Sequence, residues 1–171
     1  YRYLVEGFED AGIFRINFDH FGTLIRKMAY RGEWEPLFTY VSTELNTQSR
    51  IREFIEGESH IKAFLLAYMG LTHYYTILPE YELGKGYVDF YLQPSPQLPD
   101  MKYAYLMEVK YMKRDEPDTR IETLLDDARK QLSQYASDKL VMDTIGGAEL
   151  KLIAVVFKGW EVVAMEESFL S

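Results

Sequence analysis

Apolar residues follow two different periods along this chain, and the period changes near residue 70. Over residues 23–45 they recur every three or four positions, which predicts two helices separated by a turn at Gly32 and Pro36. Residues 49–70 repeat the same spacing, so one face of a further helix is apolar and Gly70 is its expected end. The first third of the chain is therefore predicted to be mainly helical.

Beyond residue 70, β-branched and aromatic residues predict strands at 73–78, 86–92 and 101–112. Side chains alternate between the two faces of a strand, so Val88, Phe90 and Leu92 are expected on one face of the second strand. Tyr87, Asp89 and Tyr91 are then expected on the other face. Residues 94–100 contain three prolines and are expected to form a loop.

Residues 118–140 have the clearest helical pattern, and Thr119 with Glu122 matches a capping box at the start of that helix. Two further strands are expected at 149–157 and 159–165. The order helix, three strands, helix, two strands predicts an α/β fold in which a mixed central sheet is flanked by helices. Residues 1–56 are interpreted as a helical extension or linker, and residues 57–171 as the main domain.

Composition narrows the class of protein. The hydrophobic fraction of 47% excludes a disordered chain, and the absence of cysteine excludes disulfides and thiolate metal sites. No apolar run reaches the roughly 20 residues that a membrane helix needs, and the first residues do not resemble a signal peptide. These features fit a cytoplasmic protein without a membrane partner. The net charge of −8 argues against a general polyanion binder but permits a local site that holds a cation.

Candidate chemistry lies in the third predicted strand, where Glu108 and Lys110 interrupt an apolar run. Residues two apart in a strand share a face and lie roughly 6.5–7 Å apart. A carboxylate in apolar surroundings needs compensation, which Lys110 or a divalent cation can supply. Asp89 on the preceding strand and Glu58 on the preceding helix would add carboxylates, and such a group suits metal-assisted phosphodiester hydrolysis.

Simpler interpretations remain open for these residues. Glu108 and Lys110 would also suit an ordinary charge pair at a sheet edge, and Glu58 would also suit the N-terminus of a helix. Gln131 would also suit the border of the apolar face of its helix. The three histidines lack the spacing of a zinc site, and His60 would point away from Glu58 on a helix.

Three segments, GYVD at 86–89, EVK at 108–110 and ARKQLSQY at 128–135, resemble the PD-(D/E)XK nuclease superfamily. The resemblance implies a restriction-endonuclease-like αβββαβ core in residues 57–171. It also implies catalytic roles for four residues: Asp89, Glu108, Lys110 and Gln131. The predicted Mg²⁺ or Mn²⁺ would be held by Asp89, Glu108, the Val109 carbonyl and Glu58. Val88 stands where the family name places a proline, which holds no metal.

The resemblance extends to a branch that forms the C-terminal domain of bacterial (Bacteroides-type) proteins with an AAA-ATPase-like module. It implies that residues 1–56 join such a module upstream. The predicted function is metal-dependent hydrolysis of nucleic-acid phosphodiester bonds, with Lys85, Arg129 and Tyr135 as weaker candidates for substrate contacts. The alternative is a catalytically silent module that binds a partner or regulates the attached ATPase, and a homo-oligomer is compatible with either.

Overall fold

Five strands form one mixed sheet in the computed structural model, which describes residues 17–47, 57–98 and 100–168. Their order across the sheet is the order in the chain, β1-β2-β3-β4-β5. Neighbouring strands are antiparallel except β3 and β4, which are parallel. The strands are β1 (Tyr75–Leu83), β2 (Gly86–Pro94), β3 (Tyr103–Met112), β4 (Glu149–Lys158) and β5 (Glu161–Ser168).

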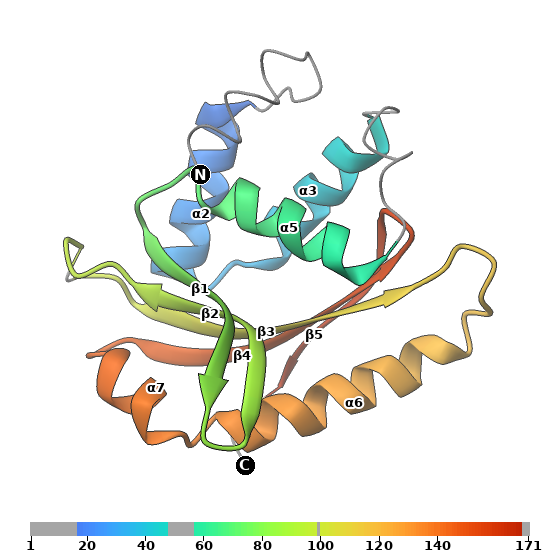
Figure 1. Cartoon of the computed structure of the whole chain (residues 1–171). Helices are drawn as coiled ribbons and strands as arrows, with labels where there is room; N and C mark the ends of the chain where they lie inside the picture. Colours follow the sequence, from blue (N-terminus) through green and yellow to red (C-terminus); the bar gives the residue numbers. More distant parts are fainter. Residues whose placement is uncertain (1–16, 48–56, 99, 169–171) are drawn as a thin grey trace.

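Helices cover both faces of this sheet, as Figure 1 shows. On one face lie α2 (Phe18–Arg31), α3 (Glu35–Thr47) and α5 (Glu58–Met69). On the other lie α6 (Arg120–Tyr135) and the short α7 (Lys139–Thr144). The chain passes through α6 and α7 between the parallel strands β3 and β4, because parallel neighbours need a crossover connection. The predicted α/β fold with a mixed sheet between helical layers is confirmed.

Each face of the sheet has its own hydrophobic core. The core under α2, α3 and α5 includes side chains of alternate residues on β3 and β4, among them Met107, Val109 and Val155. The core under α6 and α7 includes the intervening strand residues, which face the other side of the sheet, such as Leu106 and Ala154. Strands buried on both faces read as continuous apolar runs, so a charged residue such as Glu108 in β3 stands out.

Most of the predicted elements are observed, and the bounds of several differ from the prediction. The turn between α2 and α3 is at Gly32, whose φ of 71° favours glycine, and Pro36 lies in the first turn of α3. The strand predicted at 73–78 continues to Leu83 because it pairs with β2 through a tight hairpin. The predicted 118–140 helix is α6 followed by the separate α7.

The capping box predicted at Thr119 and Glu122 is wrong. Thr119 already has helical backbone angles, and its side chain makes no capping hydrogen bond. The N–H groups of Arg120 and Ile121 donate to the carbonyls of Pro117 and Asp118 instead. The backbone turn therefore begins earlier and satisfies the first donors without a side chain.

Helices α2 and α3 share the first core with α5 and the sheet, although they lie before residue 57. Residues 1–16 and 48–56 of the predicted helical extension lie outside the described residues. The division of the chain at residue 56 stays a prediction. No helix in the described ranges combines the length and apolar character needed to cross a membrane.

Candidate active site

The sheet opens between β2 and β3, and the two predicted acids lie at this opening. The paired residues of these strands end at Phe90 and Met107, so Asp89 and Glu108 come next on each strand. Beyond these residues, the carboxylate of one strand accepts a backbone N–H of the other strand. The Val109 N–H donates to Asp89 Oδ2 at 2.8 Å, and the Asp89 N–H donates to Glu108 Oε1 at 3.4 Å. The two carboxylates, 19 positions apart in the sequence, are thus brought together.

Glu108 is the most unusual charged residue of this site because its side chain is only 1% exposed. Its Oε2 accepts a hydrogen bond from Lys110 Nζ at 3.0 Å. Burial, followed by the negative charge of Asp89, raises the pKa of Glu108 to about 7, although Lys110 acts in the opposite direction. One ammonium group therefore does not fully compensate the buried carboxylate.

Gln131 reaches the same site from α6. Its Oε1 accepts a hydrogen bond from Lys110 Nζ at 2.5 Å, so the ammonium is held between Glu108 on its own strand and Gln131 on the helix. Tyr135, one turn further along α6, is buried in the core beneath that helix. Its hydroxyl lies beside Gly86, where a Cβ would be 2.9 Å from the oxygen.

A second lysine, Lys62 on α5, contacts Asp89 from the opposite helical layer. Lys62 Nζ lies 2.5 Å from Asp89 Oδ1 and 2.6 Å from Glu58 Oε1. Burial lowers the pKa of Lys62, but the hydrogen bonds to Asp89 and Glu58 outweigh that effect and the net pKa is raised. Lys62 is not among the residues predicted from the sequence, although its position four residues after Glu58 is a signal for a helical ion pair.

An open depression of about 250 Å³ lies beside this pair. Lys62, Asp89 and Glu80 are among its lining residues. The depression exposes polar groups of α5, β1 and β2 to solvent next to the opening of the sheet. It therefore provides a route from solvent to Asp89.

The predicted alternation of β2 is wrong at Val88. Phe90 and Leu92 pack on the α5 side of the sheet as expected, but Val88 packs on the α6 side with Tyr91. On the neighbouring strand β1, Glu80 lies between the residues paired with Phe90 and Val88, and its φ of 45° departs from extended backbone. The strand is thus irregular beside Asp89, so simple alternation does not apply there.

Other predicted site residues lie at varying distances from this cluster. Val109 is fully buried, and its N–H is bonded to Asp89. Lys85 is exposed in the turn between β1 and β2. Arg129 is bound by carboxylates of its own helix and of β5, namely Glu122, Asp126 and Glu166. These contacts already occupy the guanidinium group, and among the described residues no contact places Lys85 or Arg129 at the Asp89–Glu108 pair.

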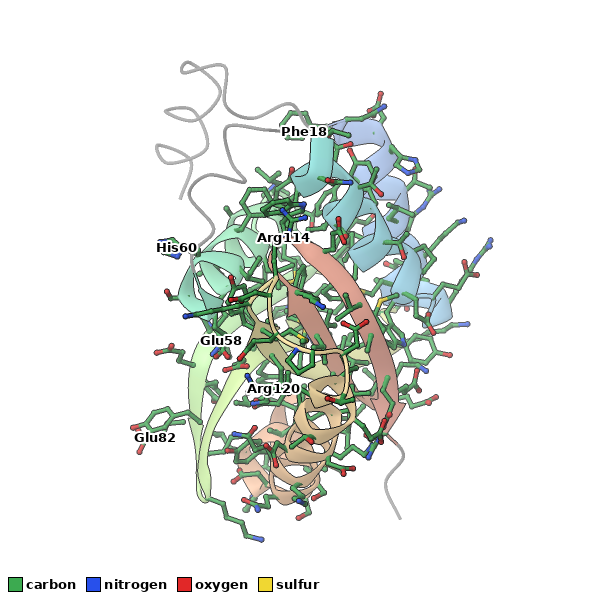
Figure 2. The ribbon with its side chains drawn as sticks, turned by 90° about the vertical axis from the view of Figure 1, so that its right-hand side faces the viewer. Phe18, Glu58, His60, Glu82, Arg114 and Arg120 are labelled. Atoms are coloured by element: carbon green, nitrogen blue, oxygen red, sulfur yellow. The ribbon has the colours of Figure 1, made fainter. Side chains whose placement is uncertain are left out.

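Within the described part of the chain, no group of three or more His, Asp or Glu residues is arranged to hold a metal ion. The cluster instead offers two carboxylates, Asp89 and Glu108, each of which accepts a backbone N–H of the other strand. His60 is exposed and points outward from α5 in Figure 2, as the helical spacing from Glu58 predicts. Oxygen donors are therefore the ligands available at this site, which suits a hard divalent ion.

The comparison with protein families agrees with this geometry. A model of the PD-(D/E)XK nuclease superfamily matches residues 56–167, which include α5, all five strands, α6 and α7. A comparison with curated proteins found no match. The matched region covers most of the chain and contains Glu58, Asp89, Glu108, Lys110 and Gln131. The chain therefore belongs to the PD-(D/E)XK nuclease superfamily.

Proposed function

We propose that this domain is a metal-dependent nuclease that hydrolyses phosphodiester bonds of nucleic acids. The observation that carries the proposal is the contact between Asp89 and the buried Glu108 at the opening of the sheet. A carboxylate whose pKa is raised by burial, and further by a neighbouring acid, is short of positive charge. Perturbed acids of this kind concentrate at functional sites, and family membership makes phosphodiester hydrolysis the best-supported chemistry.

The residues fit a divalent ion of the hard type. Asp89, Glu108 and the carbonyl of Val109 would hold Mg²⁺ or Mn²⁺ through oxygen atoms. When bound, such an ion supplies polarisation of the phosphoryl oxygen and a more acidic water. A cation would also offset the two effects that raise the pKa of Glu108, its burial and its repulsion by Asp89. The fit thus follows from the charge and chemistry of the side chains.

Lys110 would assist the attacking water and offset the negative charge that develops on the phosphate. Its ammonium group is already oriented by Glu108 and Gln131, which leaves a third donor for water or substrate. The amide of Gln131 limits the positions that Lys110 can take. In this proposal Gln131 therefore acts by placing the ammonium.

The substrate would reach Asp89 through the depression between α5, β1 and β2. Since the net charge of −8 repels polyanions at long range, we propose that an attached ATPase-like module brings nucleic acid to this cytoplasmic domain. The weaker substrate candidates are Lys85 and Tyr135, with Arg129 least suited because carboxylates bind it.

The test combines metal binding with cleavage. The metal-free chain is titrated with Mn²⁺ by calorimetry and then incubated with single- and double-stranded DNA and RNA. Asp89→Asn is expected to abolish both binding and cleavage. Asp127→Asn is the matched control, since Asp127 is exposed on α6 and makes only a 3.9 Å ion pair with Lys130.

Two outcomes would contradict the proposal. Absence of Mn²⁺ binding by the wild-type chain would remove the metal site, and cleavage that survives Asp89→Asn would place the activity elsewhere. If the chain binds Mn²⁺ but cuts none of the four substrates, the alternative is favoured. That alternative is a silent module that binds a partner or regulates an ATPase.

A further inference from the structure

Lys62 occupies an unusual position for a lysine, because its ammonium group bridges two carboxylates that the sequence analysis assigned to metal binding. Nζ contacts Glu58 Oε1 on one side and Asp89 Oδ1 on the other. The side chain of Lys62 is only 19% exposed, so its ion pair with Asp89 is screened less than a surface ion pair. The bridge joins α5 to the opening of the sheet.

The two oxygens of Asp89 have separate partners. Oδ2 accepts the N–H of Val109 on β3, while Oδ1 accepts the ammonium group of Lys62. A cation placed between Asp89 and Glu58 would need the same oxygens that Lys62 now contacts. A cation placed between Asp89 and Glu108 would not displace Lys62. Lys62 thus already fills the position between Asp89 and Glu58.

The charge of the cluster is consistent with this division. Glu58, Asp89 and Glu108 supply three negative charges, while Lys62 and Lys110 supply two positive ones. One divalent ion would change the net charge from −1 to +1, which suits a phosphodiester anion. A second divalent ion would add an excess of positive charge that the described residues do not offset.

We propose that Lys62 is the built-in second cation of the site, so that the domain binds a single divalent ion at Asp89, Glu108 and the Val109 carbonyl. Glu58 then acts as a positioning residue that holds Lys62 rather than as a metal ligand. This inference rests on the proposed function, because it assigns the number of metal ions to the same site. It also explains why no three-acid group is found in the described residues.

The experiment measures Mn²⁺ stoichiometry and affinity by calorimetry on the metal-free chain. The wild type is expected to bind one ion. Lys62→Met removes a positive charge that repels the ion bound beside it at Asp89, so its Mn²⁺ affinity should rise by about tenfold. Lys62→Arg keeps the charge and should bind like the wild type. Glu58→Gln should weaken binding by less than about tenfold, because Glu58 is not a ligand.

Lys130→Met is the matched control for Lys62→Met, because it changes the net charge equally at an exposed position of α6. Its Mn²⁺ affinity should equal that of the wild type. Circular dichroism establishes that each variant is folded. If Lys62→Met does not fold, Lys62→Arg and Glu58→Gln still decide the question.

The inference is overturned if the wild type binds two ions, if Glu58→Gln abolishes binding, or if Lys62→Met binds Mn²⁺ no more tightly than the wild type. If the chain cleaves nucleic acid, any of these three outcomes would overturn the inference about Lys62 but leave the proposed function intact. A wild-type chain that binds no Mn²⁺ would overturn both.

Discussion

Two clusters of charged side chains each include a residue of α6, and they differ mainly in burial. The first, which we call the strand-opening cluster, consists of Glu108, Asp89, Lys110, Lys62 and Gln131. The second, the guanidinium cluster, joins Arg129 to Glu122, Asp126 and Glu166. Glu108 is 1% exposed, whereas Arg129 is 34% exposed and Glu122 is 71% exposed.

The difference in burial changes what the charges are able to do. In the guanidinium cluster the hydrogen bond from Arg129 lowers the pKa of Glu166, which is therefore stabilised as an anion. In the strand-opening cluster burial raises the pKa of Glu108, which remains in need of a further cation. Similar residue types thus form an ordinary surface network in one place and a candidate catalytic site in the other.

The largest effect is expected for Glu108→Ala. Loss of this carboxylate should abolish Mn²⁺ binding and reduce cleavage on the order of 1000-fold, as for other groups that stabilise a transition state. Glu122→Ala is the counterpart in the guanidinium cluster and should leave cleavage within about twofold of the wild type. The measurement is kcat/KM on the best nucleic-acid substrate. Equal losses of kcat/KM in the two variants would show that the two clusters do not differ in function.

The next effect concerns Lys110, the ammonium group between Glu108 and Gln131. Lys110→Met should reduce the cleavage rate at saturating Mn²⁺ by about 100-fold, because general acid–base assistance and charge compensation are lost. Mn²⁺ affinity should not fall, since Lys110 is not a ligand and its ammonium group repels a cation at Glu108. A variant that loses Mn²⁺ affinity but keeps the rate at saturating metal would show that Lys110 supports the ligands instead.

A smaller effect is expected on stability as a function of pH. Glu108 has a pKa of about 7 in the folded protein against an ordinary value of 4.5, so the folded state retains a proton between these values. The free energy of unfolding should therefore fall as pH rises through this window. We compare the free energies of unfolding of Glu108→Gln and the wild type by urea denaturation without metal. The difference should shift in favour of Glu108→Gln by roughly 1–3 kcal/mol between pH 4.5 and pH 8.

For Glu166→Gln, the stability relative to the wild type should change with pH in the opposite direction. Because the pKa of Glu166 is lowered in the folded protein, its ionised form stabilises the wild type once the pH exceeds the ordinary value. The Gln variant should therefore lose stability relative to the wild type as pH rises from acid to neutral. Parallel pH profiles for Glu108→Gln and Glu166→Gln would refute the electrostatic difference between the two clusters.

The smallest effect is expected for Arg129→Gln. The guanidinium group contacts two exposed carboxylates and the half-buried Glu166, and ion pairs at largely exposed positions contribute little to stability. The urea midpoint should fall slightly, and cleavage should stay within about twofold of the wild type. A large loss of cleavage without unfolding would instead support the predicted contact of Arg129 with substrate.

Several features of the fold were predictable because they depend on local periodicity. Residues 103–112 are apolar on both faces, which identified a strand buried between two layers and made Glu108 conspicuous. The spacing of apolar residues likewise indicated α5 and α6. The capping box at Thr119 and the alternation at Val88 failed because they depend on how the chain turns and pairs, which a local pattern does not specify.

The sequence by itself determined the types of elements, the acids available in them and the helix that carries Gln131. The tertiary structure decided which of these side chains meet. Asp89 meets Lys62 of α5, and Lys110 meets Gln131 of α6, beside the point where the pairing of β2 with β3 ends. Arg129, two positions before Gln131, turns instead toward Glu166 on β5. Such contacts depend on strand register and on the direction of each helix face, which emerge only when distant segments pack together.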